Sequence, residues 1–436
     1  MKKPTTFAVH TLGCKLNQAE SETLARDLAG RGDFVGAGNE ADAFIINTCS
    51  VTHAADRKAR HLVRMLRMRN PRSRIIVTGC GAGLAGEALC ACGADLAVAN
   101  TAKMAIPELL ADWLPEKAAK EYKPGQLNAT DRVRSFIKIQ DGCRNFCAYC
   151  IVPLVRGRVY CISAGEVVAQ IGARVRDGYR EAVLTGTEVG SYDSGGSGLT
   201  DLVGSVLRKT HIERLRLSSL QPQHITRELL DLWQNNRMCR HFHIALQSGS
   251  DPVLQRMRRS YDTNLFRRAL DLIRSTLPDA SVTTDIMVGF PGESDEEFAE
   301  SYEFCELMGF AAIHVFPFSA RPGPAAAGMT GKVSEKTKRQ RSRAMLDLAA
   351  RSADRFSAGF TGKAMEVLWE SEVRKGSGVY SGLTGNYIRV YADSREDISN
   401  SVKVARLASP AVQAAGPVLR PSTRGNHGEL WSMIIR

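Results

Sequence analysis

The sequence lacks the features that mark membrane proteins, secreted proteins and low-complexity chains. Within its 436 residues no apolar run approaches the ~18–20 residues that a membrane-spanning helix requires. The first segment, MKKPTTFAVHTLG, has no apolar core of the signal-peptide kind, and the chain has no internal repeat. We therefore expect a globular, cytoplasmic protein of roughly two to three domains with no membrane partner.

Acidic residues are few relative to basic ones, and the cysteines do not suit disulfide bonds. Lys and Arg number 58 against 46 for Asp and Glu, which gives a net charge of +12 at pH 7. This excess favours a polyanionic partner. The 11 cysteines are odd in number, and in a reducing compartment cysteines act as metal ligands or reactive thiols rather than as bridges.

The first hundred residues alternate between short apolar runs and helical segments. The helical segments are 17–30, with Asn17 as the expected N-cap, and 51–69. The apolar runs have the composition of buried parallel strands. They are Phe7–Leu12, Ala43–Asn47, Arg74–Thr78 and Ala94–Ala99. This order predicts an α/β protein whose N-terminal domain, 1–115, is a small doubly wound parallel sheet, and the polar segment 112–132 predicts a linker.

A second series of strands and helices begins at Ser135. Its clearest helix, 294–308, starts with a capping box formed by Ser294 and Glu297. Six apolar runs predict strands: Phe136–Gln140, Glu181–Thr185, Arg214–Ser218, Phe242–Leu246, Val282–Val288 and Ala311–Phe316. Six β/α units over about 220 residues fit a partial (β/α)6 barrel, since a complete eight-unit barrel needs roughly 250. We assign this domain to residues 132–358.

The pattern changes again after Phe360. Before it, a helix over Lys332–Arg355 carries eight basic and three acidic residues. After it come glycine-punctuated β-type runs, namely AMEVLWESE, GVYSGLTGNYIRVYA and SVKVARLAS. This spacing predicts a small β-barrel over residues 360–436. From Pro410 onward no pattern is recognisable, and the sequence does not predict whether this domain binds RNA.

Cys143, Cys147 and Cys150 form a Cys-x3-Cys-x2-Cys run directly after a predicted strand. Three thiolates so close in sequence can surround one soft metal centre, and a set of three leaves one coordination position open for a substrate or cofactor. One alternative is a zinc site with a fourth ligand from elsewhere, although zinc sites usually pair Cys-x2-Cys motifs. The other alternative is a set of buried cysteines without a metal.

Cys14, Cys49 and Cys80 each follow one of the first three predicted strands. The carboxyl ends of parallel strands lie at one edge of a sheet, so these cysteines are expected to converge there. Gly13 and Gly79 precede two of them and allow tight turns. A single such cysteine is more typical of a small core residue, but three at equivalent positions favour a ligand set. The remaining cysteines are predicted to be structural: Cys90, Cys92, Cys161, Cys239 and Cys305.

These residues resemble a known family. The Cys-x3-Cys-x2-Cys run, with Tyr149 before its last cysteine, resembles the radical S-adenosylmethionine signature, and three further N-terminal cysteines resemble the second cluster of the methylthiotransferases. The segments Gly13–Asn17 and Asn47–His53 are most similar to the branch that acts on N6-threonylcarbamoyladenosine in tRNA. The branches that act on isopentenyladenosine in tRNA and on a ribosomal protein usually differ at these points. The C-terminal region is similar, more weakly, to the small RNA-binding barrel (TRAM-like) that ends these enzymes.

The resemblance implies an enzyme with two 4Fe-4S clusters and S-adenosylmethionine as cofactors. It implies that the Cys143/Cys147/Cys150 cluster generates a 5′-deoxyadenosyl radical and that the Cys14/Cys49/Cys80 cluster donates the sulfur. The implied reaction converts N6-threonylcarbamoyladenosine at tRNA position 37 into its 2-methylthio derivative. The implied partners are tRNA and an electron donor such as flavodoxin or ferredoxin, and we expect a monomer.

Further residues at the ends of predicted barrel strands resemble the family's contacts to S-adenosylmethionine. Together with Tyr149 they are Gly186, Thr187, Glu188, Arg216, Ser218, Gln247, Asp285 and Gly289. The first three are implied at the methionine amino group, where Thr187 stands in place of the family's second glycine. Arg216 and Ser218 are implied at the carboxylate and ribose, because the planar fork of arginine suits a carboxylate. Asp285 and Gly289 belong to the segment implied along the adenine, and Gln247 is implied to face the active site.

Residues 57–74 carry eight Arg or Lys and no acidic residue. Such a run is commonly a solvated helix face. This helix, however, starts close after Cys49, which favours contact with phosphates near the active site. Arg60, Arg64 and Arg67 lie at i, i+4 and i+7 and are the predicted RNA contacts. The basic helix at 332–355 extends the same predicted surface.

Two other functions remain open at this point. A methylthiotransferase that modifies a protein side chain would use the same chemistry, but its substrate surface would not need to be this basic. An iron–sulfur RNA-binding regulator without turnover would not need the segments that resemble a cofactor pocket.

Overall fold

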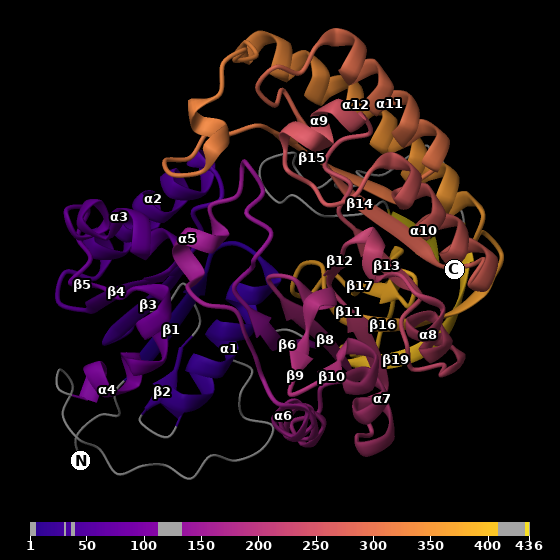
Figure 1. The fold of residues 1–436 in the computed structure, drawn as a ribbon. Helices are drawn as coiled ribbons and strands as arrows, with labels where there is room; N and C mark the ends of the chain where they lie inside the picture. The colour runs from indigo at the N-terminus through magenta and orange to yellow at the C-terminus, as the bar shows by residue number, and fades with distance from the viewer. Residues whose placement is uncertain (1–5, 30–31, 36–39, 112–132, 409–431, 436) are drawn as a thin grey trace. The chain divides into compact units, whose positions relative to one another are not determined.

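The computed structural model describes residues 6–29, 32–35, 40–111, 133–408 and 432–435 (Figure 1). The chain divides into two compact units. The first comprises Met1–Gly178, Leu184–Glu188 and Ser319–Ala327, and the second comprises Tyr179–Val183, Val189–Phe318 and Gly328–Arg436. In the described parts of the chain, no helix combines the length and apolar composition needed to cross a membrane. The predicted linker, 112–132, lies outside the described residues.

The N-terminal part of the first unit is a five-stranded parallel sheet of order β2-β1-β3-β4-β5. Its strands are β1 (Thr6–Thr11), β2 (Asp33–Phe34), β3 (Ala43–Thr48), β4 (Arg74–Gly79) and β5 (Leu96–Ala97). Its helices are α1 (Lys15–Ala29), α2 (His53–Arg69), α3 (Cys80–Cys90), α4 (Ile106–Ala111) and the 3-10 helix η1 (Asn100–Ala105). These bounds confirm the predicted alternation of strands and helices.

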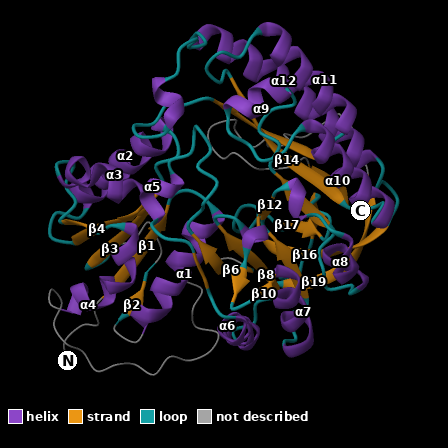
Figure 2. Cartoon of the chain, viewed as in Figure 1, coloured by secondary structure: helices purple, strands orange, loops and turns teal. Residues whose placement is uncertain are grey.

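Helices cover both faces of this sheet because neighbouring strand residues point to opposite sides. Phe44 and Ile46 pack with α2 and α3 on one face, whereas Ile45 and Ile76 pack with α1 and α4 on the other. The predicted doubly wound sheet is therefore confirmed (Figure 2).

The predicted N-cap of the first helix was wrong. The helix α1 begins at Lys15, so Asn17 lies inside its first turn. The side-chain Nδ2 of Asn17 instead donates hydrogen bonds to the carbonyl oxygens of Leu12 and Thr48, at 2.9 and 3.1 Å. This buried side chain thus joins the loops that follow β1 and β3.

The rest of the first unit and the start of the second contain the first β/α units of the predicted barrel. The elements are β6 (Arg134–Asp141), α5 (Val152–Arg156), β7 (Tyr160–Cys161), α6 (Ala164–Arg176) and β8 (Glu181–Gly186). Residues Leu184–Gly186 of β8 fall in the first unit with β6 and β7. Residues Glu181–Val183 fall in the second unit with β11 (Arg214–Leu217), in a sheet of order β11-β8-β6-β7.

The second unit continues the β/α series in a parallel sheet of order β12-β13-β14-β15. Its strands are β12 (Ser219–Leu220), β13 (His241–Ile244), β14 (Ser281–Val288) and β15 (Ala312–Pro317), beside the short hairpin β9 (Asp193–Ser194) and β10 (Ser197–Gly198). Its helices are α7 (Leu199–Lys209), α8 (Arg227–Asp231), α9 (Asp251–Arg256), α10 (Thr263–Thr276), α11 (Asp295–Met308) and α12 (Glu335–Ala358). Short 3-10 helices are η2 (Val189–Ser191), η3 (Pro222–His224), η4 (Leu232–Gln234) and η5 (Ala325–Gly328).

All six predicted barrel strands are present, as β6, β8, β11–β12, β13, β14 and β15. The third differs in detail, because Ser218 interrupts it between β11 and β12. The capping box is also confirmed: Ser294 Oγ accepts from the Glu297 amide at 3.2 Å, and the Ser294 amide donates to Glu297 Oε2 at 2.9 Å.

The C-terminal part of the second unit is a closed barrel of order β16-β17-β18-β20-β19, which confirms the predicted β-barrel. Its core includes Val367, Trp369, Val390 and Leu407. The strands are β16 (Ala364–Glu372), β17 (Val379–Thr384), β18 (Arg389–Asp393), β19 (Ser401–Ala408) and β20 (Ser432–Ile435). The segment 409–431 lies outside the described residues.

Candidate active site

The first cysteine triad, Cys14, Cys49 and Cys80, lies at the carboxyl edge of the N-terminal sheet. The strands β1, β3 and β4 are adjacent and in register at their ends, where Thr48 pairs with Gly79. Cys49 follows β3 directly, Cys80 is the first residue of α3 after β4, and Cys14 lies in the turn after β1. The sheet therefore brings the three cysteines to one edge, as their spacing predicted.

Two glycines allow the chain to approach closely at this edge. At Gly13 the φ angle is +113°, and an added Cβ would lie 2.6 Å from Cys49 Cβ and 3.2 Å from Cys49 Sγ. At Gly79 φ is +91°, and an added Cβ would lie 2.4 Å from the carbonyl oxygen of Thr48. A side chain at Gly13 would displace the side chain of Cys49, and one at Gly79 would displace the backbone of Thr48, which precedes Cys49.

Burial disfavours ionisation of two thiols of this triad, those of Cys49 and Cys80. It raises the pKa of Cys49 to about 12 and also raises the pKa of Cys80, whereas the positive charge of Arg156 acts in the opposite direction on both. Metal ligands must be thiolates, so a bound metal has to displace these protons. A nearby cation favours that displacement.

The second triad, Cys143, Cys147 and Cys150, lies in the loop after β6 and in the same unit as the first. The thiol of Cys143 donates to Glu188 Oε2 at 3.4 Å, and Asn145 Nδ2 donates to Glu188 Oε1 at 2.7 Å. Burial, and next to it the Glu188 carboxylate, raises the pKa of Cys143 to about 12. Glu188, predicted from the sequence as a cofactor contact, is therefore directly beside this triad.

The spacing of the thiols argues against a single zinc ion. Zinc–sulfur bonds are about 2.3 Å long, so two sulfur ligands of one ion lie less than about 4.6 Å apart. Among the described residues, the one group of three ligand atoms found within 4.8 Å of each other contains no cysteine. In neither triad, therefore, do the three sulfur atoms lie as close together as the ligands of a single zinc ion.

Three further residues that were predicted as cofactor contacts lie at the end of β8 or in the loop after β6. Gly186 ends β8, where an added Cβ would lie 2.9 Å from the carbonyl oxygen of Gln140, and Thr187 Oγ1 donates to Asp141 Oδ1 at 3.2 Å. Tyr149 lies within the loop of the second triad. In the second unit, the buried Ser218 hydroxyl has no hydrogen-bond partner among the residues that the structure describes, so it is available to a ligand.

Arg216 has partners that the sequence did not indicate. Its guanidinium is fully buried, with Nε donating to Glu181 Oε1 at 2.8 Å and Nη1 donating to the carbonyl oxygen of Gly385 at 3.1 Å. Its centre also lies 4.8 Å from the ring centroid of Tyr387. The structure thus corrects the interpretation of Arg216 as a contact for the methionine carboxylate. Its guanidinium already donates to Glu181 and to the carbonyl oxygen of Gly385, both within the second unit.

Gln247 and Gly289 occupy special backbone positions. Gln247 has a φ of +71°, and its amide donates to the carbonyl oxygen of Asp285 at 2.8 Å. Gly289 follows β14 with a φ of +73°, and its amide donates to Glu293 Oε2 at 2.6 Å.

The basic helix α2 presents most of its positive charge to solvent. Its apolar side, formed by Ala59, Val63 and Leu66, is buried against the sheet. Arg64 is exposed and Arg60 is half-buried, so the structure leaves both side chains within reach of a partner.

Arg67 does not share this role, which corrects the sequence prediction. Its guanidinium donates to the carbonyl oxygens of Gly93, Pro71 and Ser73 at 2.8–2.9 Å and pairs with Asp95 at 2.6 Å. These bonds tie α2 to the loops around β4 and β5. The exposed Arg57 lies instead on the same solvent-facing side of α2 as Arg60 and Arg64, because the three residues are spaced i, i+3 and i+7.

Comparisons with known proteins agree with this arrangement. Residues 137–305 match the Radical SAM superfamily, and residues 6–99 match the Uncharacterized protein family UPF0004. The threonylcarbamoyladenosine tRNA methylthiotransferase MtaB of Thermotoga maritima is 35% identical over 418 residues, which cover 93% of this chain and 96% of the relative. The enzyme of the same name from Bacillus subtilis is 35% identical over 422 residues, which cover 92% of this chain and 93% of the relative.

The chain belongs to the radical S-adenosylmethionine tRNA methylthiotransferases. The tRNA-2-methylthio-N(6)-dimethylallyladenosine synthase of Thermodesulfovibrio yellowstonii is 30% identical over 411 residues, covering 91% of this chain and 95% of the relative. Among solved structures, the radical S-adenosylmethionine methyltransferase TsrM from Kitasatospora setae has a TM-score of 0.58 at 14% identity, covering 75% of this chain and 77% of that one. The latter likeness shows the fold alone.

Methylthiotransferases of this family use S-adenosylmethionine and two 4Fe-4S clusters. The donor set of this enzyme fits them, because two groups of three soft thiol ligands each leave one metal position free of cysteine. The zinc alternative does not fit the spacing described above. A regulator without turnover is likewise excluded by the membership in an enzyme family.

Sequence reasoning missed Arg321 in this methylthiotransferase. Its guanidinium pairs with Asp56 at 2.7 Å and donates to Ser50 Oγ at 2.8 Å, within the first unit. Ser50 follows Cys49, and Asp56 lies in the first turn of α2. Arg321 therefore fixes the start of the basic helix to the loop of a triad cysteine. Arg321 lies far from both in sequence, so no local signal points to this contact.

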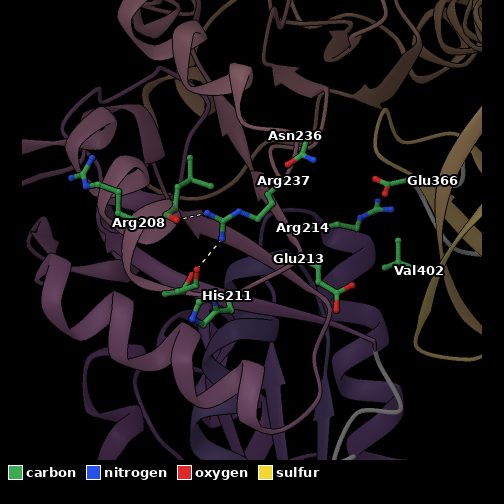
Figure 3. A pocket seen from close by; sticks show the side chains of 10 residues that line it. Arg208, His211, Glu213, Arg214, Asn236, Arg237, Glu366 and Val402 are labelled. Atoms are coloured by element: carbon green, nitrogen blue, oxygen red, sulfur yellow. Dashed lines mark hydrogen bonds between the residues drawn. The ribbon is translucent and has the colours of Figure 1, made fainter.

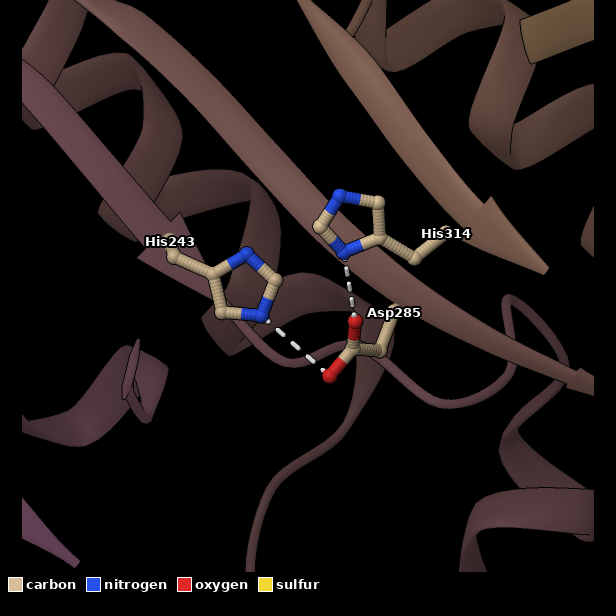
Figure 4. Close-up of side chains that lie close together, drawn as sticks. All are labelled: His243, Asp285 and His314. Carbon is tan, nitrogen blue, oxygen red and sulfur yellow. Dashed lines mark hydrogen bonds and ion pairs between the residues drawn. The ribbon is translucent and has the colours of Figure 1, made fainter. Parts of the chain in front are cut away.

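A second group missed by the sequence involves Asp285. Figure 4 shows its carboxylate between two imidazoles, with His243 Nε2 at 3.2 Å and His314 Nδ1 at 3.1 Å. Burial alone would raise the pKa of Asp285, but the two imidazoles hold the pKa of this carboxyl below its usual range. Each oxygen has one ring nitrogen as a partner, so the group is complete as a hydrogen-bonded network without a metal ion.

A cavity of about 480 Å³ in the second unit is not part of the candidate active site. It lies at the amino ends of β11 and β13, whereas barrel chemistry occurs at the carboxyl ends. Figure 3 shows Arg237 at its centre, donating to the carbonyl oxygen of Thr210 at 2.8 Å. The lining residues are Leu207, Arg208, Thr210, His211, Glu213, Arg214, Asn236, Arg237, Glu366 and Val402.

Proposed function

We propose that this enzyme adds a methylthio group to carbon 2 of N6-threonylcarbamoyladenosine at tRNA position 37. The supporting observation is that five relatives named threonylcarbamoyladenosine tRNA methylthiotransferase are 32–35% identical, against 30–31% for three dimethylallyladenosine synthases. The segments Gly13–Asn17 and Asn47–His53, which resemble the same branch, form the loops that carry Cys14 and Cys49.

The two triads divide the work in this proposal. Cys143, Cys147 and Cys150 hold the cluster that binds S-adenosylmethionine, and Cys14, Cys49 and Cys80 hold the cluster that provides sulfur. When bound, these cofactors supply the radical chemistry that breaks an inert aromatic C–H bond and the sulfur that replaces the hydrogen. Glu188, bonded to Asn145 beside Cys143, supplies a carboxylate for the methionine amino group. Ser218 supplies a free hydroxyl for the ribose.

The tRNA is proposed to bind along α2 through Arg57, Arg60 and Arg64. Their charge is of one sign, and Asp56 at the start of the helix is already paired with Arg321. Phosphate contacts of this kind hold the nucleic acid without reading its sequence. We further propose a cytoplasmic monomer that receives electrons from flavodoxin or ferredoxin.

The test is mass spectrometry of tRNA nucleosides from cells that lack the gene. We expect the 2-methylthio derivative of N6-threonylcarbamoyladenosine to disappear and its precursor to accumulate, with rescue by the wild-type gene but not by a Cys49→Ala variant. Loss of the methylthiolated isopentenyladenosine instead would establish the alternative substrate. An unchanged nucleoside profile with a changed ribosomal protein mass would point to the protein-modifying alternative.

A further inference from the structure

Arg156 lies between the two cysteine triads of the first unit. It is the last residue of α5, which begins two residues after Cys150. Ile151 and Val155, beside and within this helix, pack against Cys80 of the other triad. The Arg156 side chain is only 2% exposed. The helix that ends in this buried arginine therefore follows the loop of the second triad and packs against a cysteine of the first.

The guanidinium of Arg156 bonds to residues that lie close in sequence to a cysteine of each triad. Its Nη2 donates to Asn17 Oδ1 at 2.7 Å, and the same oxygen lies 3.9 Å from Cys14 Sγ, whose thiol donates to it. Its Nη1 donates to Asp141 Oδ1 at 3.1 Å, and Asp141 precedes Cys143 by two residues. One cation thus connects the loop of Cys14 with the loop of Cys143.

The charges around Arg156 do not cancel within the protein. Three cations, Lys103, Lys138 and Arg156, surround two carboxylates, Glu20 and Asp141. The group therefore carries one surplus positive charge in a place with little access to water. Buried charge is costly without a counter-charge. Deprotonated ligand cysteines of the first triad would supply a counter-charge: Cys14 Sγ lies 3.9 Å from the Asn17 oxygen to which Arg156 donates, and Cys80 packs against Val155 of α5.

We propose that Arg156 is a positioning residue that holds Asn17 beside Cys14 and raises the reduction potential of the cluster bound by Cys14, Cys49 and Cys80. This inference rests on the proposed assignment of those cysteines as cluster ligands. Reduction adds a negative charge to a cluster, and a buried cation stabilises the more negative state. The negative charge of Glu20, whose carboxylate accepts a hydrogen bond from Arg156 at 3.0 Å, should lower the reduction potential of the same cluster.

The experiment uses the full-length chain with Cys143, Cys147 and Cys150 replaced by alanine, so that one cluster remains. After anaerobic reconstitution, its reduction potential is measured by a redox titration followed by electron paramagnetic resonance. In this background we compare Arg156, Arg156→Gln and Arg156→Lys. We expect Arg156→Gln to shift the potential to more negative values, while Arg156→Lys, which keeps the charge, stays near the parent.

Two further variants test whether a change in potential comes from the charge beside the first triad. Glu20→Gln removes a negative charge from the same group and must shift the potential in the opposite direction, even if Arg156→Gln fails to fold. Arg174→Gln is the matched control, because Arg174 is also buried in this unit but bonds to Glu22 and Ser135, and no shift is expected.

The outcomes separate the two proposals. If the parent retains no iron, the assignment of Cys14, Cys49 and Cys80 as ligands is wrong, and the role of Arg156 falls with it. If the parent holds about four irons but Arg156→Gln and Glu20→Gln leave the potential unchanged, or shift it in the same direction, the role of Arg156 is wrong while the ligand assignment stands.

Discussion

The two cysteine triads reach similar ligand sets by opposite routes. Cys143, Cys147 and Cys150 are neighbours in one loop, whereas Cys14, Cys49 and Cys80 meet because three parallel strands end at one edge. Their surroundings also differ, since the carboxylate of Glu188 lies beside Cys143 and the cation of Arg156 acts on Cys49 and Cys80. Two centres with the same ligands can thus be given different chemistry by the charges next to them.

The largest effect is expected from removing the loop triad. Replacing Cys143, Cys147 and Cys150 together by alanine should lower the iron content of reconstituted protein from about eight to about four per chain. Neither 5′-deoxyadenosine nor methylthiolated tRNA should form, because the variant lacks the cysteines proposed to hold the radical-generating cluster. Iron analysis and chromatography of the products check both results. Full iron content in this variant would show that the ligands are divided differently.

The basic helix should affect tRNA without affecting either triad. Changing Arg57, Arg60 and Arg64 to glutamine should weaken tRNA binding and make its logarithmic salt dependence shallower, by about 0.7–0.9 for each phosphate that is no longer bound. Uncoupled cleavage of S-adenosylmethionine should stay unchanged, since it needs no tRNA. Titrations at three salt concentrations measure the slope, and an unaltered slope would remove α2 from the binding surface.

Arg67→Gln is the matched control for that experiment. This side chain lies on the same helix but bonds to Gly93 and pairs with Asp95. We expect a lower stability, on the order of 2–3 kcal/mol for the charged hydrogen bonds that are removed, and an unchanged salt slope. Thermal unfolding and the same tRNA titration distinguish the two effects, and a shallower slope in Arg67→Gln would place this residue on the binding surface after all.

A smaller effect concerns acid stability near the strand-edge triad. Burial alone would raise the pKa of Glu20, but Lys103, Arg156 and Lys138 outweigh it and lower the pKa to about 2 from an ordinary value of 4.5. A depressed carboxyl pKa stabilises the fold above about pH 4.5, and this stability is lost as the pH falls towards 2.

Glu20→Gln should therefore remove part of the pH dependence of unfolding of the metal-free protein between these limits, on the order of 2–3 kcal/mol. Urea unfolding between pH 3 and pH 6 provides the measurement. Equal slopes for the wild type and the variant would show that Glu20 is not held ionised by its neighbours.

Regular backbone geometry explains what the sequence predicted well. The convergence of Cys14, Cys49 and Cys80 follows from strand order alone, and the six barrel strands follow from apolar runs. Arg67 and Arg216 were misjudged because helical spacing and family motifs do not reveal distant backbone carbonyls that accept from a guanidinium.

Contacts between distant segments explain what the sequence could not predict. The group of Asp285 with His243 and His314 depends on the register of three strands, in which Asp285 pairs with His314. The bonds of Arg156 to Asn17 and Asp141 depend on how α5 packs against Cys80. Neither arrangement leaves a pattern in any one stretch of sequence.

The two triads are proposed to perform different steps, and a variant without the strand-edge triad separates these steps. With Cys14, Cys49 and Cys80 replaced by alanine, the enzyme is incubated anaerobically with S-adenosylmethionine, a reductant and tRNA carrying N6-threonylcarbamoyladenosine. We expect 5′-deoxyadenosine to form still, while the 2-methylthio product is absent. Methylthiolated tRNA at the wild-type level would contradict the assignment of this triad as the sulfur donor.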